Sequence, residues 1–161
     1  MTSGPGPPEI GRPAPAFVLG DQHGVPWRLA DMSGMTVVVL FFPWAFTDVC
    51  SSELGEVAAD LGRFQNDAVQ VLAVSCDSPY ALRVYDQQAG LGFPLLSDYW
   101  PHGAVASAYG VLDERRGCAQ RGTFVVDGAG VLRWSDVTPM GRARDLADVR
   151  AALDELGGGR R

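Results

Sequence analysis

The chain reads Thr36-Val37-Val38-Val39-Leu40-Phe41-Phe42-Pro43-Trp44-Ala45-Phe46-Thr47-Asp48-Val49-Cys50 at the point that decides its fold. Residues 36–42 are β-branched, aliphatic or aromatic without interruption, a pattern typical of a strand buried on both faces of a sheet. From Asp48 to about Gln65, apolar residues repeat at helical spacing. A buried strand that passes directly into a helix indicates an α/β fold.

Strands and helices alternate on both sides of this junction. We expect a β-hairpin formed by residues 17–19 and 25–29, strands at 69–75, 95–96, 123–126 and 131–137, and helices at 48–65, 78–88, 105–109 and 145–156. A hairpin followed by βαβα and then ββα is the order of elements in a thioredoxin-like α/β sandwich. The sequence therefore predicts an α/β, thioredoxin-like fold, with an N-terminal β-hairpin extension and a central mixed sheet flanked by helices.

The length of the chain, 161 residues, suits one domain with a single good core. Neither a repeat nor an interdomain linker interrupts the sequence. We expect one domain over residues 1–161, with flexible ends at residues 1–12 and 157–161.

Composition excludes several classes of protein. The formal charge is −6 and no basic patch stands out, which argues against a nucleic-acid surface. The longest apolar stretch, residues 35–46, is too short to cross a membrane and contains Pro43. The Gly- and Pro-rich residues 1–15 resemble neither a signal peptide nor an anchor. Three cysteines without a close pair do not make a disulfide framework, so we expect a cytoplasmic protein with reduced thiols.

Cys50 is placed where a thiol can become reactive. Thr47 takes the N-cap position of the predicted helix, so Cys50 falls in the first turn. Unpaired backbone N–H groups and the positive end of the helix dipole stabilise an anion there. Ligands of open α/β sheets bind at the carboxyl ends of the strands, which is where this turn lies. The alternative is a small apolar side chain packed in the helix.

Two segments resemble the active site of the peroxiredoxin family. The spacing Pro43-x-x-x-Thr47-x-x-Cys50 is similar to the family's motif around its peroxidatic cysteine. Residues 121–127, Arg-Gly-Thr-Phe-Val-Val-Asp, look like the strand that carries the family's active-site arginine. Residues 41–47 further resemble the AhpE-like, one-cysteine branch of this alkyl hydroperoxide reductase/thiol-specific antioxidant superfamily. The resemblance extends from residue 11 to residue 156.

The resemblance implies a thiol-dependent peroxidase for hydrogen peroxide, organic hydroperoxides or peroxynitrite. Cys50 would be the peroxidatic thiolate, which attacks the peroxide and becomes a sulfenic acid. Thr47 would direct its hydroxyl to the thiolate and the peroxide, and Arg121 would stabilise the negative charge that develops. Pro43 would exclude water and shape the loop. Taken singly, these residues have plainer roles: a strand end for Pro43, a helix cap for Thr47 and a surface cation for Arg121.

Glu53 and Arg144 are supporting candidates. Glu53 resembles the acidic residue that the family pairs with a second arginine, and Arg144 is our candidate for that arginine. An exposed ion pair contributes little to stability, so we expect this pair to hold the active-site helix in place.

A resolving cysteine would have to be Cys76 or Cys118. Cys118 precedes Arg121 by three residues, which places the two on opposite faces of a regular strand, unless a bulge intervenes near Gly117. Cys76 ends a predicted strand at the same sheet edge as Cys50, but a disulfide needs Cα atoms within about 7 Å. We expect both to be structural. The resemblance then implies an external reductant, such as a low-molecular-weight thiol or a thioredoxin- or mycoredoxin-type protein. An atypical two-cysteine peroxidase that uses Cys76 is the alternative.

Other function classes have less support. No Cys/His spacing of the metal-site type and no phosphate-binding glycine loop occur, so we assign neither metal nor cofactor. A disulfide reductase would need a second cysteine where Glu53 stands. A redox sensor or relay that uses Cys50 without turnover stays open. Because aromatic residues are enriched at interfaces and peroxiredoxins dimerise near the peroxidatic cysteine, we expect a homodimer. The aromatic candidates for this interface are Trp44, Phe46, Tyr80 and Trp100.

Overall fold

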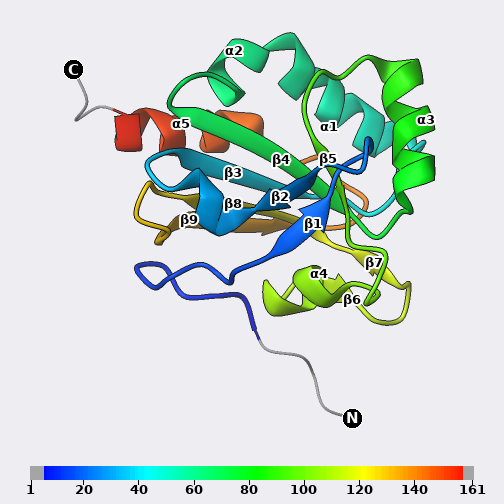
Figure 1. Cartoon of the computed structure of the whole chain (residues 1–161), viewed down its shortest axis with the longest axis horizontal. Helices are drawn as coiled ribbons and strands as arrows, with labels where there is room; N and C mark the ends of the chain where they lie inside the picture. Colours follow the sequence, from blue (N-terminus) through cyan, green and yellow to red (C-terminus); the bar gives the residue numbers. More distant parts are fainter. Residues whose placement is uncertain (1–5, 158–161) are drawn as a thin grey trace.

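A mixed five-stranded sheet forms the centre of the protein (Figure 1). The computed structural model describes residues 6–157. The strands lie in the order β5 (Leu95–Ser97), β4 (Val69–Ser75), β3 (Thr36–Phe41), β8 (Arg121–Val126) and β9 (Leu132–Thr138). Strands β3, β4 and β5 run parallel, whereas β8 pairs antiparallel with both β3 and β9. The predicted strands of the sheet are confirmed.

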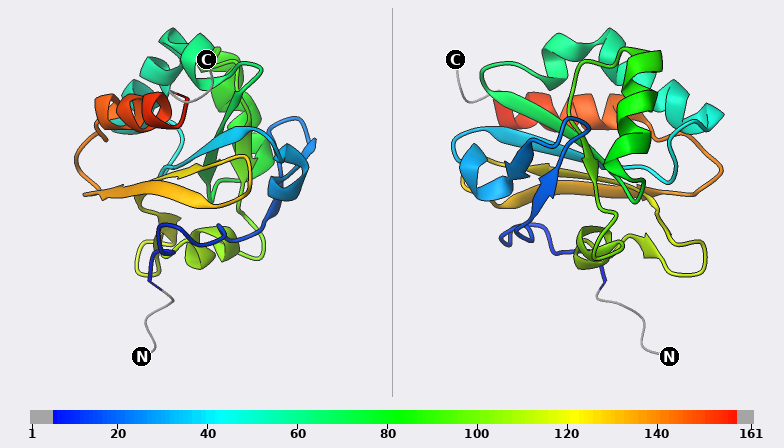
Figure 2. Two further views of the ribbon diagram at one scale, coloured as in Figure 1. Left: turned by 90° about the vertical axis from the view of Figure 1, so that its left-hand side faces the viewer. Right: turned by 45° about the vertical axis from the view of Figure 1, so that its right-hand side comes forward.

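Helices cover both faces of the sheet (Figures 1 and 2). One face carries α1 (Asp48–Ala59), α2 (Leu61–Phe64), α3 (Pro79–Ala89) and α5 (Leu146–Gly157), and the other carries α4 (Ala104–Ala108) and the N-terminal segment. No helix in residues 6–157 is long and apolar enough to cross a membrane. The thioredoxin-like α/β fold is confirmed.

The apolar run of β3 is buried because its residues alternate between two cores. Val38 and Leu40 pack with α1, α3 and α5, whereas Val37, Val39 and Phe41 pack with the N-terminal hairpin and α4. Each fully buried side chain of this size contributes about 1.5–3 kcal/mol relative to an exposed one. The strand that leads to Cys50 is therefore firmly held in the sheet.

The predicted N-terminal hairpin is confirmed as β1 (Val18–Gly20) and β2 (Pro26–Arg28). Its turn is held by Asp21, whose carboxylate accepts the backbone N–H groups of His23 and Val25 at 2.8 and 3.0 Å. The ends that we expect to be flexible fall partly outside the described residues, in residues 1–5 and 158–161. Within residues 6–12, the backbones of Gly11 and Arg12 are hydrogen-bonded to Leu132.

Two local predictions were wrong, and one hairpin was not predicted. The helix expected over residues 48–65 breaks at Asp60, which leaves helical geometry at φ −118° and ψ 34° and directs Phe64 into the core. A 3₁₀ helix, η1 (Leu29–Met32), follows the hairpin and includes Leu29, which we expected to end the second strand of that hairpin. A second small hairpin pairs β6 (Leu112–Asp113) with β7 (Cys118–Ala119). Strands of two residues are too short for a pattern of alternation, so sequence periodicity missed them.

Candidate active site

The end of β3 and the start of α1 place Cys50 in the interior. Thr47 is the N-cap residue of α1, as expected, with extended backbone at φ −91° and ψ 151°. Cys50 follows in the first turn, and its side chain is fully buried. The connecting loop is held from the side, because the backbone N–H of Ala45 donates to the Asp77 carboxylate at 2.9 Å.

Arg121, the first residue of β8, contacts the sulfur of Cys50. Its Nη1 lies 3.2 Å from Cys50 Sγ and 2.5 Å from Oε1 of Glu53. Its Nε donates to the carbonyl oxygen of Met140 at 3.0 Å, which fixes the plane of the guanidinium. Because β8 runs antiparallel to β3, its first residue, Arg121, lies beside the C-terminal end of β3. Hydrogen bonds to Glu53 and Met140 therefore hold the guanidinium beside the Cys50 thiol.

Arg144 completes a buried cluster of charges. Its backbone N–H and its Nε donate to Oε2 of Glu53 at 2.7 and 3.0 Å, and its Nη1 donates to Thr123 Oγ1 at 2.9 Å. Its Nη2 donates to the carbonyl oxygen of Phe41. Burial lowers the pKa of Arg144, and the Glu53 carboxylate opposes that shift.

The pair that we expected to be exposed is therefore buried: Glu53 is 3% exposed and Arg144 6%. Two arginines and one glutamate carry a net charge of +1 beside Cys50. A thiolate at Cys50 would bring the formal charge of these four side chains to zero.

A pocket of about 310 Å³ opens beside this cluster. It is lined by Pro43, Trp44, Thr47, Asp48, Val49, Arg116, Arg121 and Met140. The Thr47 hydroxyl donates to the carbonyl oxygen of Trp44 at 3.0 Å and does not cap α1. The structure thus brings together all six residues singled out by sequence: Cys50, Arg121, Glu53 and Arg144 in the interior, and Pro43 and Thr47 at the pocket with Arg121.

Comparisons with known proteins agree with this geometry. The model of the family described as AhpC/TSA matches residues 10–135, most of the chain. The chain belongs to the AhpC/TSA family. It is 44% identical over 148 residues to alkyl hydroperoxide reductase E of Mycobacterium tuberculosis, covering 89% of this chain and 97% of that protein. It is also 33% identical over 156 residues to a putative peroxiredoxin in the rubredoxin operon of Clostridium pasteurianum, covering 89% of this chain and 86% of that protein.

Solved structures of the family share the whole architecture. AhpC of Enterococcus faecalis superposes with a TM-score of 0.83 at 26% identity, covering 94% of this chain and 95% of that chain. The mitochondrial 2-Cys peroxiredoxin of Plasmodium falciparum gives a TM-score of 0.80 at 25% identity, covering 91% and 93%. The protein is thus a peroxiredoxin, an enzyme of the thiol peroxidase class.

Tyr85 of α3 supports this peroxiredoxin's active-site helix, and sequence reasoning missed it. Its hydroxyl donates to Ser51 Oγ at 3.0 Å, and its ring meets the ring of Phe46 edge-on at a centroid distance of 5.1 Å. Phe46 has a left-handed backbone, with φ at +70°. Such a conformation is costly for a non-glycine residue and persists only where the surroundings impose it. No local sequence pattern links residues that are more than thirty positions apart, so this contact could not be predicted from such patterns.

The other two cysteines of this peroxiredoxin are buried and free. Burial raises the pKa of the Cys76 thiol to about 12, and burial also raises that of Cys118. Cys118 lies in β7 and Arg121 in β8, so the two residues do not share one regular strand. The rule of opposite faces along one strand therefore does not apply to Cys118.

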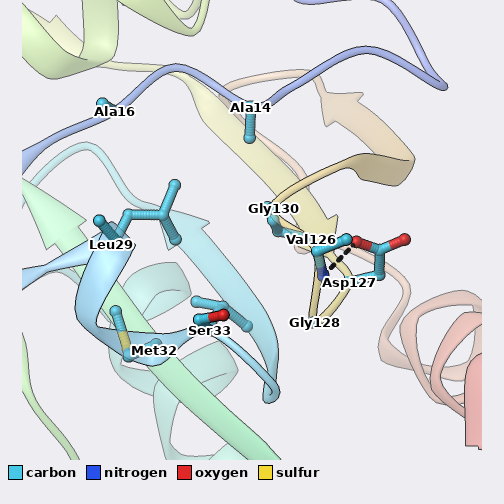
Figure 3. A pocket seen from close by; sticks show the side chains of 12 residues that line it. Ala14, Ala16, Leu29, Met32, Ser33, Val126, Asp127, Gly128 and Gly130 are labelled. Carbon is cyan, nitrogen blue, oxygen red and sulfur yellow. Dashed lines mark hydrogen bonds between the residues drawn. The ribbon is translucent and has the colours of Figure 1, made fainter.

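A second cavity, of about 290 Å³, lies at the opposite end of β3 from Cys50 (Figure 3). Alanine, leucine and methionine side chains line much of it, and the Asp127 carboxylate accepts the backbone N–H of Ala129 at 2.9 Å. This carboxylate serves its own turn and offers no chemistry to the cavity. Within residues 6–157, no three His, Cys, Asp or Glu side chains gather as a metal site would require.

Proposed function

We propose that Cys50 is the peroxidatic residue of this enzyme. The contact of 3.2 Å between Arg121 Nη1 and Cys50 Sγ carries the proposal. The thiolate attacks the terminal oxygen of a hydroperoxide, and the O–O bond breaks. Cys50 becomes a sulfenic acid, and the other oxygen leaves as a hydroxide or alkoxide that takes up a proton or, from peroxynitrite, as nitrite. The substrates are hydrogen peroxide, organic hydroperoxides or peroxynitrite.

Arg121 and Thr47 stabilise the transition state. As the S–O bond forms, negative charge spreads from sulfur onto both peroxide oxygens. A guanidinium fixed beside the sulfur interacts more strongly with that charge than with the neutral peroxide, which lowers the barrier. The Thr47 hydroxyl adds to this once it turns from the carbonyl oxygen of Trp44 and donates to the peroxide. Pro43 supplies an apolar wall that limits water. Glu53 and Arg144 do not touch the peroxide; they position Arg121 and tie α1 to the sheet.

The buried thiols favour a one-cysteine mechanism. A resolving cysteine attacks the sulfenic acid as a thiolate. With its pKa raised to about 12, Cys76 is almost entirely protonated near neutral pH. An external thiol then attacks the sulfenic acid, releases water and forms a mixed disulfide, which a second thiol reduces. Low-molecular-weight thiols and thioredoxin- or mycoredoxin-type proteins are the reductant classes. Three free thiols also fit a reducing compartment such as the cytoplasm.

Mass spectrometry after one equivalent of hydrogen peroxide tests this mechanism. We expect a sulfenic acid at Cys50 and no intramolecular disulfide. Peroxide consumption with excess dithiothreitol should be lost in Cys50→Ser and retained in Cys76→Ser and Cys118→Ser. A disulfide that contains Cys50 would refute the one-cysteine mechanism. Oxidation of Cys50 without turnover would instead indicate a sensor.

A homodimer is the proposed assembly. Exposed aromatic side chains follow β3, β4 and β5 at the carboxyl ends of these strands, in two loops and in the first turn of α3: Trp44, Phe46, Tyr80, Tyr99 and Trp100. Exposed aromatic clusters mark interfaces. Light scattering should give twice the 17.2 kDa of one chain. Trp100→Glu should shift the mass toward the monomer, whereas Ile10→Glu, a change at another exposed apolar side chain, should not. A monomeric wild type would refute the proposal.

A further inference from the structure

A second arginine lines the pocket that contains Arg121. Arg116 lies in the loop between β6 and β7, and its side chain is 64% exposed. The Arg121 side chain is only 4% exposed and contacts Cys50. The pocket therefore has one cation beside the sulfur and another at its solvent side.

The pocket holds two cations on a protein that is negative overall. Its lining holds the cations of Arg116 and Arg121 and one carboxylate, that of Asp48. The whole chain carries a formal charge of −6. Between the charges, Trp44, Val49 and Met140 present apolar surface. A pocket of about 310 Å³ is at the small end of the range for organic ligands. Its chemistry suits a short apolar chain with an anionic end.

Arg116 is held in place by its own loop. The Asp113 carboxylate accepts a hydrogen bond from Nη1 of Arg116 at 2.9 Å. It also accepts hydrogen bonds from the backbone N–H groups of Arg115 and Arg116, both at 3.1 Å. The carbonyl oxygen of Gly117 is hydrogen-bonded to His102 Nε2 at 2.7 Å, which anchors the end of the loop. Across residues 6–157, Nε and Nη2 of Arg116 have no hydrogen-bond partner within the protein. Two donors of a positioned guanidinium thus stay available to a ligand.

We propose that Arg116 selects organic hydroperoxides that carry a carboxylate a few carbon atoms from the peroxide group. The inference rests on the proposed role of Cys50. The peroxide group reacts beside Arg121, the alkyl chain lies against the apolar wall, and the carboxylate accepts Nε–H and Nη2–H of Arg116. The reaction is unchanged: sulfur takes the terminal oxygen, and the alcohol leaves with its carboxylate intact.

A matched pair of substrates isolates this interaction. The probes are a tertiary alkyl hydroperoxide with a terminal carboxylate and the methyl ester of the same compound. Their rates of consumption are measured at pH 7 with dithiothreitol, a neutral reductant, and expressed as the acid-to-ester ratio of kcat/KM. We expect Arg116→Gln to lower this ratio about fivefold, the size of one exposed charge pair, and Arg116→Glu to lower it further. Added salt should lower the ratio of the wild type.

Arg115→Gln is the matched control, because Arg115 is the adjacent arginine and does not line this pocket. Its ratio should equal that of the wild type. The proposal is overturned if both Arg116 variants keep the wild-type ratio, or if Arg115→Gln lowers it as much as Arg116→Gln. Cys50→Ser separates the two proposals: if this variant still consumes the ester, the proposed role of Cys50 fails, whatever the Arg116 variants do.

Discussion

One oxygen of Glu53 accepts two hydrogen bonds from Arg144, from the backbone N–H at 2.7 Å and from Nε at 3.0 Å. The other oxygen lies 2.5 Å from Nη1 of Arg121. A single carboxylate on α1 therefore joins two arginines from distant segments. It fixes one of them against the sulfur of Cys50.

Removing the charge of Glu53 should destabilise the protein. Glu53→Gln keeps the shape of the side chain but leaves two buried guanidinium groups without their carboxylate. We expect the free energy of unfolding to fall by about 3 kcal/mol, as when one partner of a buried ion pair is lost. Urea denaturation measures this change. Glu56→Gln, on the exposed side of the same helix, is the control. Equal stabilities of the two variants would contradict a structural role for the cluster.

Arg121→Lys should lose most of the peroxidase activity despite keeping the charge. Nη1 of Arg121 is hydrogen-bonded to Cys50 and Glu53, and its Nε donates to the carbonyl oxygen of Met140. A single lysine ammonium group cannot make these hydrogen bonds in the same directions. We expect the rate constant for oxidation by hydrogen peroxide to fall about 100-fold, as when one oxyanion donor is removed. Arg133→Lys, at an exposed arginine of β9, should keep the wild-type rate constant. A wild-type rate constant in Arg121→Lys would show that charge alone suffices.

The sequence predicted the centre of the site better than its surroundings. Pro43, Thr47 and Cys50 lie within one short junction, and Arg121 begins the strand that pairs with β3, so sheet pairing brings these segments together. The resemblance of the two segments to the peroxiredoxin motifs, and not hydrophobic periodicity, indicated that they share one site. The contact of Tyr85 with Ser51 depends instead on how α3 packs against α1, which no local pattern encodes.

The charged residues show a second limit of sequence reasoning. Arg144 looked like a surface partner of Glu53, but the segment before α5 folds inward and buries both. Arg116 was not singled out at all. Its place at the pocket depends on the β6–β7 hairpin, whose strands are too short to leave a pattern in the sequence.

The left-handed backbone of Phe46 predicts an unusual order of stability. At φ +70°, alanine retains the conformational strain, whereas glycine relieves it. Both substitutions lose the ring contact with Tyr85. We therefore expect Phe46→Gly to be more stable than Phe46→Ala by about 1 kcal/mol, measured by urea denaturation. At Val84, on the exposed face of α3, the order should reverse, since glycine weakens a helix by about 1 kcal/mol relative to alanine. If glycine and alanine had the same order of stability at both positions, backbone strain at Phe46 would be contradicted.

The Cys76 thiol should make the protein sensitive to alkali. Burial, aided by the negative charge of Asp98, raises its pKa from 9.0 to about 12. The folded state therefore holds this proton more tightly than the unfolded chain. The resulting stability is fully present below pH 9.0 and is lost as the pH rises toward about 12.

Cys76→Ala removes this titration, so its stability should fall less than that of the wild type above pH 9.0. Near pH ~10.5, the free energy of unfolding of the wild type should have fallen by about 2 kcal/mol more than that of Cys76→Ala. Urea denaturation at stepped pH measures it. Tyrosine titration affects both proteins alike, and the chain has no lysine to add to it. Parallel losses of stability in the wild type and Cys76→Ala across this window would show that Cys76 ionises as easily in the folded protein as in the unfolded chain.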